Sequence, residues 1–312
     1  MKTTMQDFAT GNTTTSTTGV STVQGKYWLK DILESAKQRM YFLQFAYVTK
    51  VVPGNKDVVV PVPSTHLTFT KSSTESTART MTQVDNMAVI TFSPALARYG
   101  ASISQEILRT SQVDYVKYTR DEMTYSVSLQ MDQAFATAIA AVSSPAATLY
   151  GGDATSTATL ESTDKMTPSL VAKALRYLKT NGWQPEPARP FIVFLSAAQE
   201  EALINDSQFI NAAEYGSNRV IMNGEIGEYI GAQIISTEQV PAATTWGAGG
   251  NLAGHTCFVL KARIAYGIAW GEEPTYDYEY KKDECMHNMY INSSYQCKTL
   301  QEKAIVLVKV VD

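Results

Sequence analysis

The sequence predicts an α+β fold, and three observations support this. Residues 113 to 142 carry apolar side chains at helical spacing, with no internal Pro or Gly. Residues 150 to 270 alternate helix and strand patterns, which is typical of a compact α/β unit. Residues 48 to 100 and 271 to 312 are rich in strand patterns. The chain should therefore combine one long helix, an α/β unit and extended strands.

Composition narrows the classes of function. The chain has 312 residues, a net charge of −4 and 18% charged residues. Non-specific nucleic-acid binding requires clustered Lys and Arg, and the nearest cluster, "EYKKDE", is balanced by its own acids and is expected to be solvated. Three cysteines are too few for a disulfide framework.

The N-terminal residues read as an arm followed by a helix. Residues 1 to 24 are rich in Thr, Ser and Gly and cannot pack a core of their own. In "KYWLKDILESAKQRMYFLQFA", Trp28, Ile32, Leu33 and Met40 recur near helical spacing, which predicts about four turns of helix. The start of the chain lacks the apolar core of a secretory signal, and the longest apolar stretch, "AFATAIAAV", is too short to span a bilayer.

Residues 48 to 100 are predicted to form a long two-stranded ribbon. "VVPGNKDVVVPVPSTHLTFT" reads as a turn, a strand and a proline-marked bend, and "MAVITF" reads as a second strand. The polar segment between them reads as the ribbon's tip. Isolated two-stranded ribbons are marginally stable in water, so this one is expected to lie on another surface, most simply another subunit.

The clearest helix, residues 113 to 142, is expected to be a rod of about 45 Å that ends at Ser144 and Pro145. One face is predicted to be apolar; it comprises Val116, Met123, Val127, Met131, Phe135 and Ile139.

The α/β unit contains recognisable helix boundaries. Thr167 and Pro168 are expected to start a helix that stops at Asn181 and Gly182. After the apolar strand "PFIVFL", Ser196 and Gln199 are expected to form a capping box.

The C-terminal part is predicted to be strands. In "TYDYEYK", Tyr276, Tyr278 and Tyr280 share one face, which is more typical of a packed strand than of a base-stacking site. Glu272 and Glu273, next to Pro274, are expected in a solvated loop. "KAIVLVKVV" is expected to be a final buried strand.

Four glycines in "NAAEYGSNRVIMNGEIGEYIGAQIIST" could cradle a phosphate or form turns. Their spacing does not match the dinucleotide pattern G-x-G-x-x-G, and there is no G-K-[ST] phosphate loop. We therefore expect them to supply turns with positive φ between short strands.

No catalytic, cofactor-binding or metal site is expected. His255-x-Cys257 and Cys285-x-His287, with Cys297 downstream, offer soft ligands at spacings that match no usual zinc signature. Cys257 is better explained as a small buried hydrophobe. Whether Cys285, His287 and Cys297 bind a metal is left open. The G-x-S-x-G and H-E-x-x-H motifs are missing from the sequence.

The segment "SQFINAAEYGSNRVIMNGEIGEYIGAQIISTEQVP" resembles a segment of the major capsid proteins of tailed bacteriophages, which have the Hong Kong 97-type fold. About 35 residues carry this motif, and the order of elements extends the resemblance over nearly the whole chain. The matching residues are Phe209, Tyr215, Gly216, Gly224, Glu225, Ile226, Gly227 and Gly231.

This resemblance implies a division of the chain into functional segments. Residues 1–44 would be an N-terminal arm and first helix, and residues 45–100 an extended loop lying over a neighbour. Residues 101–150 with 271–312 would be a peripheral domain containing the long spine helix, and residues 151–270 an axial α/β domain. The glycine turns would then shape a wall between subunits.

The resemblance also implies a function and partners. The protein would assemble with itself into hexamers and pentamers of an icosahedral head, with scaffold, portal and decoration proteins as further partners. The shell would enclose double-stranded DNA without binding it specifically, and would not contact a membrane. The protein would be found in the virion, and in the host cytoplasm during assembly.

Three alternatives remain open on the sequence alone. One is the shell of an encapsulin-like compartment, and another is a different virion part, such as a tail or decoration protein. The third is an enzyme whose α/β unit is catalytic.

Overall fold

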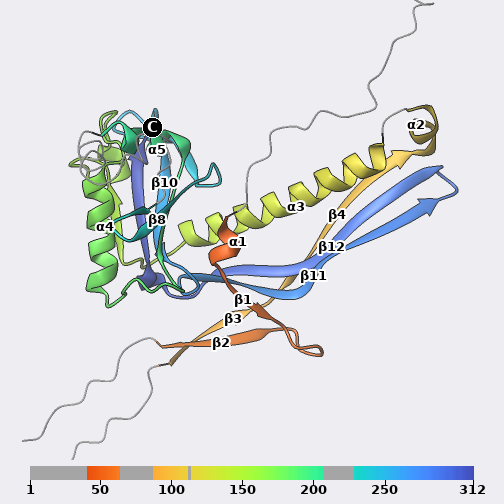
Figure 1. The fold of residues 1–312 in the computed structure, drawn as a ribbon, viewed down its shortest axis with the longest axis horizontal. Coiled ribbons are helices and arrows are strands. Elements are labelled where there is room, and N and C mark those ends of the chain that lie inside the picture. The colour runs from red at the N-terminus through yellow and green to blue at the C-terminus, as the bar shows by residue number, and fades with distance from the viewer. Residues whose placement is uncertain (1–40, 64–86, 112–113, 207–227) are drawn as a thin grey trace, which may run out of the picture.

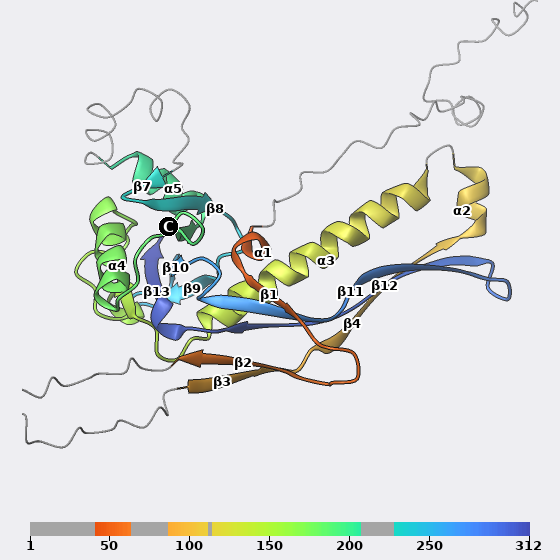
Figure 2. The ribbon, with the colours of Figure 1, turned by 60° about the horizontal axis from the view of Figure 1, so that its bottom comes forward.

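The computed structural model describes residues 41–63, 87–111, 114–206 and 228–312. This part of the chain is elongated: a seven-stranded sheet with its helices lies at one end, and a long helix beside a four-stranded sheet extends away from it (Figure 1). A two-stranded ribbon forms a third, separate sheet that packs beside the four-stranded one (Figure 2). The predicted α+β class is confirmed.

The seven-stranded sheet mixes parallel and antiparallel strands. Its order is β5-β13-β10-β6-β8-β7, and β9 also pairs with β10. The pairs β13–β5 and β6–β8 are parallel. The strands are β5 (Ala147–Tyr150), β6 (Phe191–Leu195), β7 (Glu228–Tyr229), β8 (Ala232–Ser236), β9 (Ala242–Trp246), β10 (Leu252–Lys261) and β13 (Ile305–Val311).

The four-stranded sheet has the order β1-β11-β12-β4. Its centre is the long antiparallel hairpin of β11 (Tyr266–Lys281) and β12 (Met286–Thr299), flanked by β4 (Ala95–Ser104) and β1 (Tyr47–Lys50). Glu272 and Glu273 lie within β11, where its register with β12 shifts, so the expected loop is wrong, although both side chains are exposed. The chain keeps its strand pairing there by forming a bulge.

The long helix is α3 (Tyr115–Ala140), which confirms the predicted rod. Asp114 caps its N-terminus by accepting a hydrogen bond from the Lys117 backbone N–H. Its buried face includes Met123, Val127, Met131, Phe135 and Ile139, as the sequence predicts, and also the carboxyl group of Asp132. Two short helices precede it in sequence, α1 (Phe42–Phe45) and α2 (Gln105–Thr110). None of the helices within the described ranges has the length and apolar content needed to cross a membrane.

The helix α4 (Pro168–Thr180) has the predicted boundaries. Thr167 Oγ1 accepts a hydrogen bond from the Leu170 N–H, and Pro168 occupies the first helical position. Asn181 is the C-cap, followed by Gly182 at a φ of 86°. The helix packs against β13, β10 and β5, so it covers the apolar sheet.

The capping box predicted for α5 (Ala197–Ile204) is wrong. Ser196 is the N-cap residue, but its hydroxyl donates to the side-chain oxygen of Gln199 instead of accepting a backbone N–H. The carboxylate of Glu238 accepts the free Ala197 N–H at 2.9 Å. A residue distant in sequence therefore caps the first N–H of α5, and the local motif does not form. The remaining short helices are η1 (Thr157–Thr159) and η2 (Glu302–Ala304).

The predicted ribbon is present as the antiparallel pair β2 (Val58–Pro63) and β3 (Met87–Phe92). Its expected tip falls in residues 64–86, outside the described residues. The segment expected as an extended loop is not wholly ribbon, because β1 and most of β4 belong to the four-stranded sheet. The helix expected within residues 26–46 lies mostly outside the described residues, and only its end is seen, as the short helix α1.

The C-terminal strand, β13, lies in the seven-stranded sheet, whereas the predicted domain boundaries group it with residues 271–299. β13 is the buried strand expected from "KAIVLVKVV", but it pairs with β10 and β5 in the seven-stranded sheet. It therefore belongs with the sheet of residues 151–270 and not with the hairpin of residues 271–299. One reason is that every β13 residue except Lys309 is buried, which requires neighbours on both faces.

An aromatic cluster joins the two ends of the molecule. The Phe42 ring stacks on Phe194 with centroids 4.3 Å apart and meets Phe258 and Tyr266 edge-on. The Tyr266 hydroxyl donates to the Phe42 carbonyl at 2.7 Å, and its ring packs on Phe135 of α3. This cluster links α1, α3 and both sheets in one continuous core.

Candidate subunit-contact surfaces

The residues that carry the capsid resemblance lie mostly outside the described residues. Phe209, Tyr215, Gly216, Gly224, Glu225, Ile226 and Gly227 fall in the gap between 206 and 228. Their expected role as turn and contact residues stays a prediction. Gly231 is described and forms part of the tight turn between β7 and β8.

The β7–β8 turn shows why glycine is needed at its second position. Tyr229 and Ala232 are paired, so Ile230 and Gly231 form a two-residue hairpin turn. Their φ values are 51° and 76°, the left-handed conformation that a type I′ turn requires. The positive φ expected at Gly231 is therefore confirmed.

Ile230 was not singled out by the sequence pattern, yet it is the more unusual turn residue. A β-branched side chain rarely adopts positive φ, and 51% of Ile230 is exposed. It lines a cavity of about 460 Å³ against Arg176 and Lys179 of α4. The corner thus presents an apolar side chain next to two cations.

The ribbon has two apolar faces. Its inner face, which includes Val58, Val60, Ile90 and Phe92, packs on Ala269 and Leu300 of the same chain. Paired residues lie on the same face of an antiparallel pair. The register therefore gives the outer face to Val59, Pro61 and Pro63 on β2, and to Met87, Val89 and Thr91 on β3.

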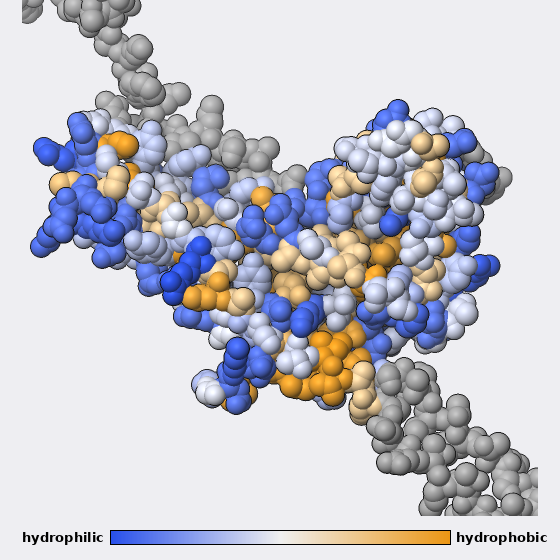
Figure 3. All heavy atoms as spheres, turned by 180° about the vertical axis from the view of Figure 1, so that it is seen from behind, coloured by the Kyte–Doolittle hydropathy of each residue, from blue (hydrophilic) through white to orange (hydrophobic). Residues whose placement is uncertain are grey.

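The outer face of the ribbon, these six residues, is exposed. The exposed fractions are 54% for Val59, 63% for Met87 and 62% for Val89. Figure 3 shows apolar side chains gathered at the lower edge of the molecule, where the ribbon lies. Contiguous exposed apolar surface of this kind marks an interaction site.

Polar contacts hold the ribbon in place from its inner side. Lys298 donates to the Thr91 carbonyl at 2.8 Å, and the Gln301 amide donates to the Pro63 carbonyl at 2.9 Å. The Ser93 N–H donates to Gln296 at 2.7 Å. The outer face is therefore presented on a strand pair that is anchored to the body of the molecule.

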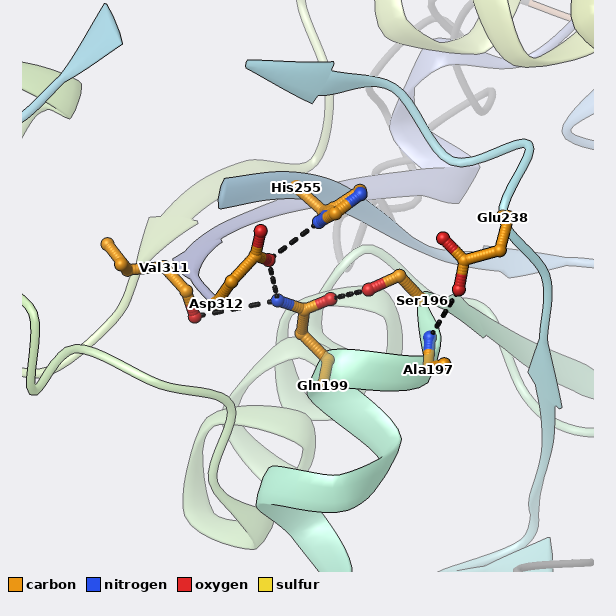
Figure 4. A network of polar contacts seen from close by, with 7 residues as sticks. All are labelled: Ser196, Ala197, Gln199, Glu238, His255, Val311 and Asp312. Atoms are coloured by element: carbon orange, nitrogen blue, oxygen red, sulfur yellow. Dashed lines mark hydrogen bonds and ion pairs between the residues drawn. The ribbon is translucent and has the colours of Figure 1, made fainter. Parts of the chain in front are cut away.

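A polar network near residue 312 contains Ser, His and Asp side chains, but not in a catalytic arrangement (Figure 4). His255 Nδ1 lies 2.7 Å from Asp312 Oδ1, and Gln199 Nε2 donates to the same oxygen at 2.8 Å. The Ser196 hydroxyl donates to Gln199, whereas a nucleophile would need to contact the histidine. The network ties α5 to residues 311 and 312.

The cysteines occupy three separate environments. Cys257 is fully buried, as predicted, and burial raises its pKa to about 12. Burial also raises the pKa of Cys297 to about 12. Cys285 is exposed at one end of the β11–β12 hairpin. Cys297 lies ten positions beyond His287 along β12, about 33 Å at strand spacing, so the structure does not bring this trio together.

The tyrosine row is only partly the packed face that the sequence predicts. Tyr276 and Tyr278 keep 41% and 50% of their surface exposed beside α3. The Tyr280 ring lies 4.6 Å from that of His287, and the Tyr278 ring 5.7 Å from it. The chain turn at residues 281–285 is exposed, which confirms that the Lys-rich stretch is a solvated surface.

Comparisons with known proteins match this architecture. The cyanophage P-SCSP1u capsid has a TM-score of 0.75 at 15% identity, covering 94% of this chain and 94% of that chain. The capsid of Ralstonia phage GP4 has a TM-score of 0.68 at 16% identity, covering 92% and 95%. That of cyanophage Pam1 has a TM-score of 0.70 at 12% identity, covering 98% and 99%. No curated protein sequence matches the chain.

The fold is thus the phage capsid fold of the Hong Kong 97 type. A family model described as "Phage capsid protein" matches residues 89–283, more than half of the chain. The chain therefore belongs to the phage capsid protein family. It is a major capsid shell protein, which places it in the virion capsid.

Proposed function

We propose that copies of this chain assemble into hexamers and pentamers of an icosahedral head around double-stranded DNA. The observation that carries this proposal is the apolar outer face of the ribbon. Burial of apolar surface is the dominant favourable contribution to most protein–protein association. A neighbouring copy would bury the outer face of the ribbon, which is exposed in the single chain.

We also propose a role for each segment of the chain. Residues 1–44 comprise the arm and the first helix, and the ribbon with residues 64–86 acts as the extended loop. The peripheral domain comprises α3 and the four-stranded sheet, and the axial domain comprises the seven-stranded sheet, including β13. Residues 207–231 then act at the contacts between axial domains. Scaffold, portal and decoration proteins remain proposed partners, as does assembly in the host cytoplasm.

We infer that the protein acts without catalysis. In the polar network around Asp312, the Ser196 hydroxyl is engaged by Gln199 and His255 is engaged by Asp312. These contacts support a structural role for the groups that an enzyme would use.

The proposal is tested by placing a charge on the outer face of the ribbon. Val89→Asp is expected to give folded, soluble subunits or capsomers and at least a tenfold loss of closed shells, because a buried unpaired carboxylate is costly. Val89→Thr has a similar shape and carries no charge, so it serves as the matched control and should assemble far better. Shells are counted by negative-stain microscopy, and folding is checked by thermal unfolding.

Closed shells at the wild-type yield from the Val89→Asp protein would mean that this face does not meet another copy.

A further inference from the structure

A groove follows α3 on the side facing β11. Two cavities, of about 540 and 220 Å³, share Arg120 and Tyr276 in their linings and so form one groove. Along α3 the lining runs from Asp114 to Met131, a length of about 26 Å. The groove exists because α3 packs mainly on β12 and β4 and leaves β11 uncovered.

The groove has an apolar floor and an aromatic rim. Val127, Met131 and Ile291 lie at the floor and are otherwise buried. The half-exposed rings of Tyr276 and Tyr278 form the rim. An apolar groove beside a helix, with aromatic side chains at its edge, suits the apolar face of an amphipathic helix.

The described chain begins at one end of this groove. The Tyr41 N–H donates to Asp132 Oδ2 at 3.0 Å, and Asp132 lies one helical turn beyond the groove residue Ser128 on the same side of α3. Phe42 is fixed in the aromatic cluster. The residues that precede Tyr41 in sequence therefore start beside the floor of the groove.

The sequence before Tyr41 has a matching pattern. Residues 26–40 carry Trp28, Leu29, Ile32, Leu33 and Met40 at helical spacing. Fifteen helical residues span about 22 Å, close to the length of the groove. We propose that residues 26–40 dock as an amphipathic helix in the groove between α3 and β11 of the same chain.

The tether also sets the register of this helix. Two α-helices rise equally, by about 1.5 Å per residue, and Tyr41 is held at Asp132. A helix that runs back along the groove is parallel to α3, which places Ala36 beside Val127 and Leu33 beside Thr124. Ser128, which lines the groove, then faces Ala36.

A pair of cysteines tests this register. In unassembled full-length protein with Cys285→Ser, the pair Ala36→Cys and Ser128→Cys is expected to form an intrachain disulfide on mild oxidation. The matched control pairs Ala36→Cys with Ser126→Cys. Ser126 lies at the same level of α3 but points away from the groove. Peptide mapping should give at least ten times more of the 36–128 link than of the 36–126 link.

A mixture of two variants, one with only Ala36→Cys and the other with only Ser128→Cys, shows whether the helix comes from the same chain or from a second copy. A 36–128 link in that mixture would assign the groove to a second copy and overturn the proposal. Equal yields for the two pairs within one chain would also overturn it. This inference concerns a single chain and does not depend on shell assembly.

A second variant gives an independent readout. Thr124→Trp fills the groove, so trypsin cleavage after Lys30 and Lys37 should become about ten times faster. Unchanged cleavage would contradict docking, because a bound helix resists proteolysis until it is released.

Discussion

At the scale of single residues, Asp132 connects the spine helix to the start of the described chain. Burial raises its pKa to about 6, and the backbone N–H groups of Tyr41 and Phe42 act in the opposite direction. The folded protein therefore retains this proton at a pH where the unfolded chain has released it. Stability contributed by the protonated group is present below about pH 4 and is lost as the pH rises to about 6.

We predict that Asp132→Asn removes this pH dependence. Asn keeps an oxygen that can accept the Tyr41 N–H and never ionises. Between pH 4 and 6, the free energy of unfolding of the wild type should fall by about 2 kcal/mol relative to the variant. Urea unfolding at several pH values measures the difference. Parallel pH profiles for the two proteins would show that Asp132 does not titrate differently on folding.

At the scale of elements, the β7–β8 hairpin depends on Gly231. Its turn needs positive φ at both central residues, and Ile230 already occupies the first of them. A Cβ added at Gly231 meets nothing within 4 Å, so any cost of substitution there comes from backbone strain and not from a clash. Substitutions at Gly231 therefore measure backbone strain alone.

We predict that Gly231→Val destabilises the protein by about 1–3 kcal/mol, since β-branched residues are strained at positive φ. Gly231→Asn should cost less than about 1 kcal/mol, because Asn tolerates this conformation. Urea unfolding of the two variants gives the comparison. If the two variants were equally stable, backbone strain would not control this turn.

Elements with strong local signals were predictable from the sequence. The spine helix follows from its uninterrupted apolar spacing, and α4 follows from Thr167, Pro168 and Gly182, whose effects act within one turn of helix. The capping of α5 was not predictable, because Glu238 lies about 40 positions from Ala197 and only the fold brings it there. The exposure of Tyr276 was missed for the same reason: it depends on where α3 lies.

At the scale of the whole molecule, sheet membership was the harder problem. The pattern in residues 305–311 predicts a buried strand, but nothing local says which sheet receives it. The resemblance predicted the capsid fold correctly. Seven of the eight residues that carry the resemblance still await a test, since Gly231 alone lies in the described part of the chain.

Residues 64–86, which connect the two strands of the ribbon, can be replaced by a short turn. Pro63 and Met87 are directly paired at the end of the ribbon, so a two-residue Asn-Gly turn can replace residues 64–86. We predict that this protein keeps its thermal unfolding midpoint within a few degrees and fails to close shells. The control replaces residues 64–86 with a Gly/Ser loop of the same length. It shows whether assembly depends on the length of the loop or on the contacts of its side chains. Normal shells from the shortened protein, seen by negative-stain microscopy, would contradict a role for the loop in assembly.

The position of β13 has a consequence for how the protein is made. This strand lies between β5 and β10, and its partner β5 is about 150 residues earlier in the chain. Synthesis must therefore reach residues 305–311 before the seven-stranded sheet can be completed. Completion of this sheet is a late folding step with high contact order. A nascent chain that has not reached residue 305 lacks a central strand of this sheet, so the topology disfavours premature joining of half-made subunits.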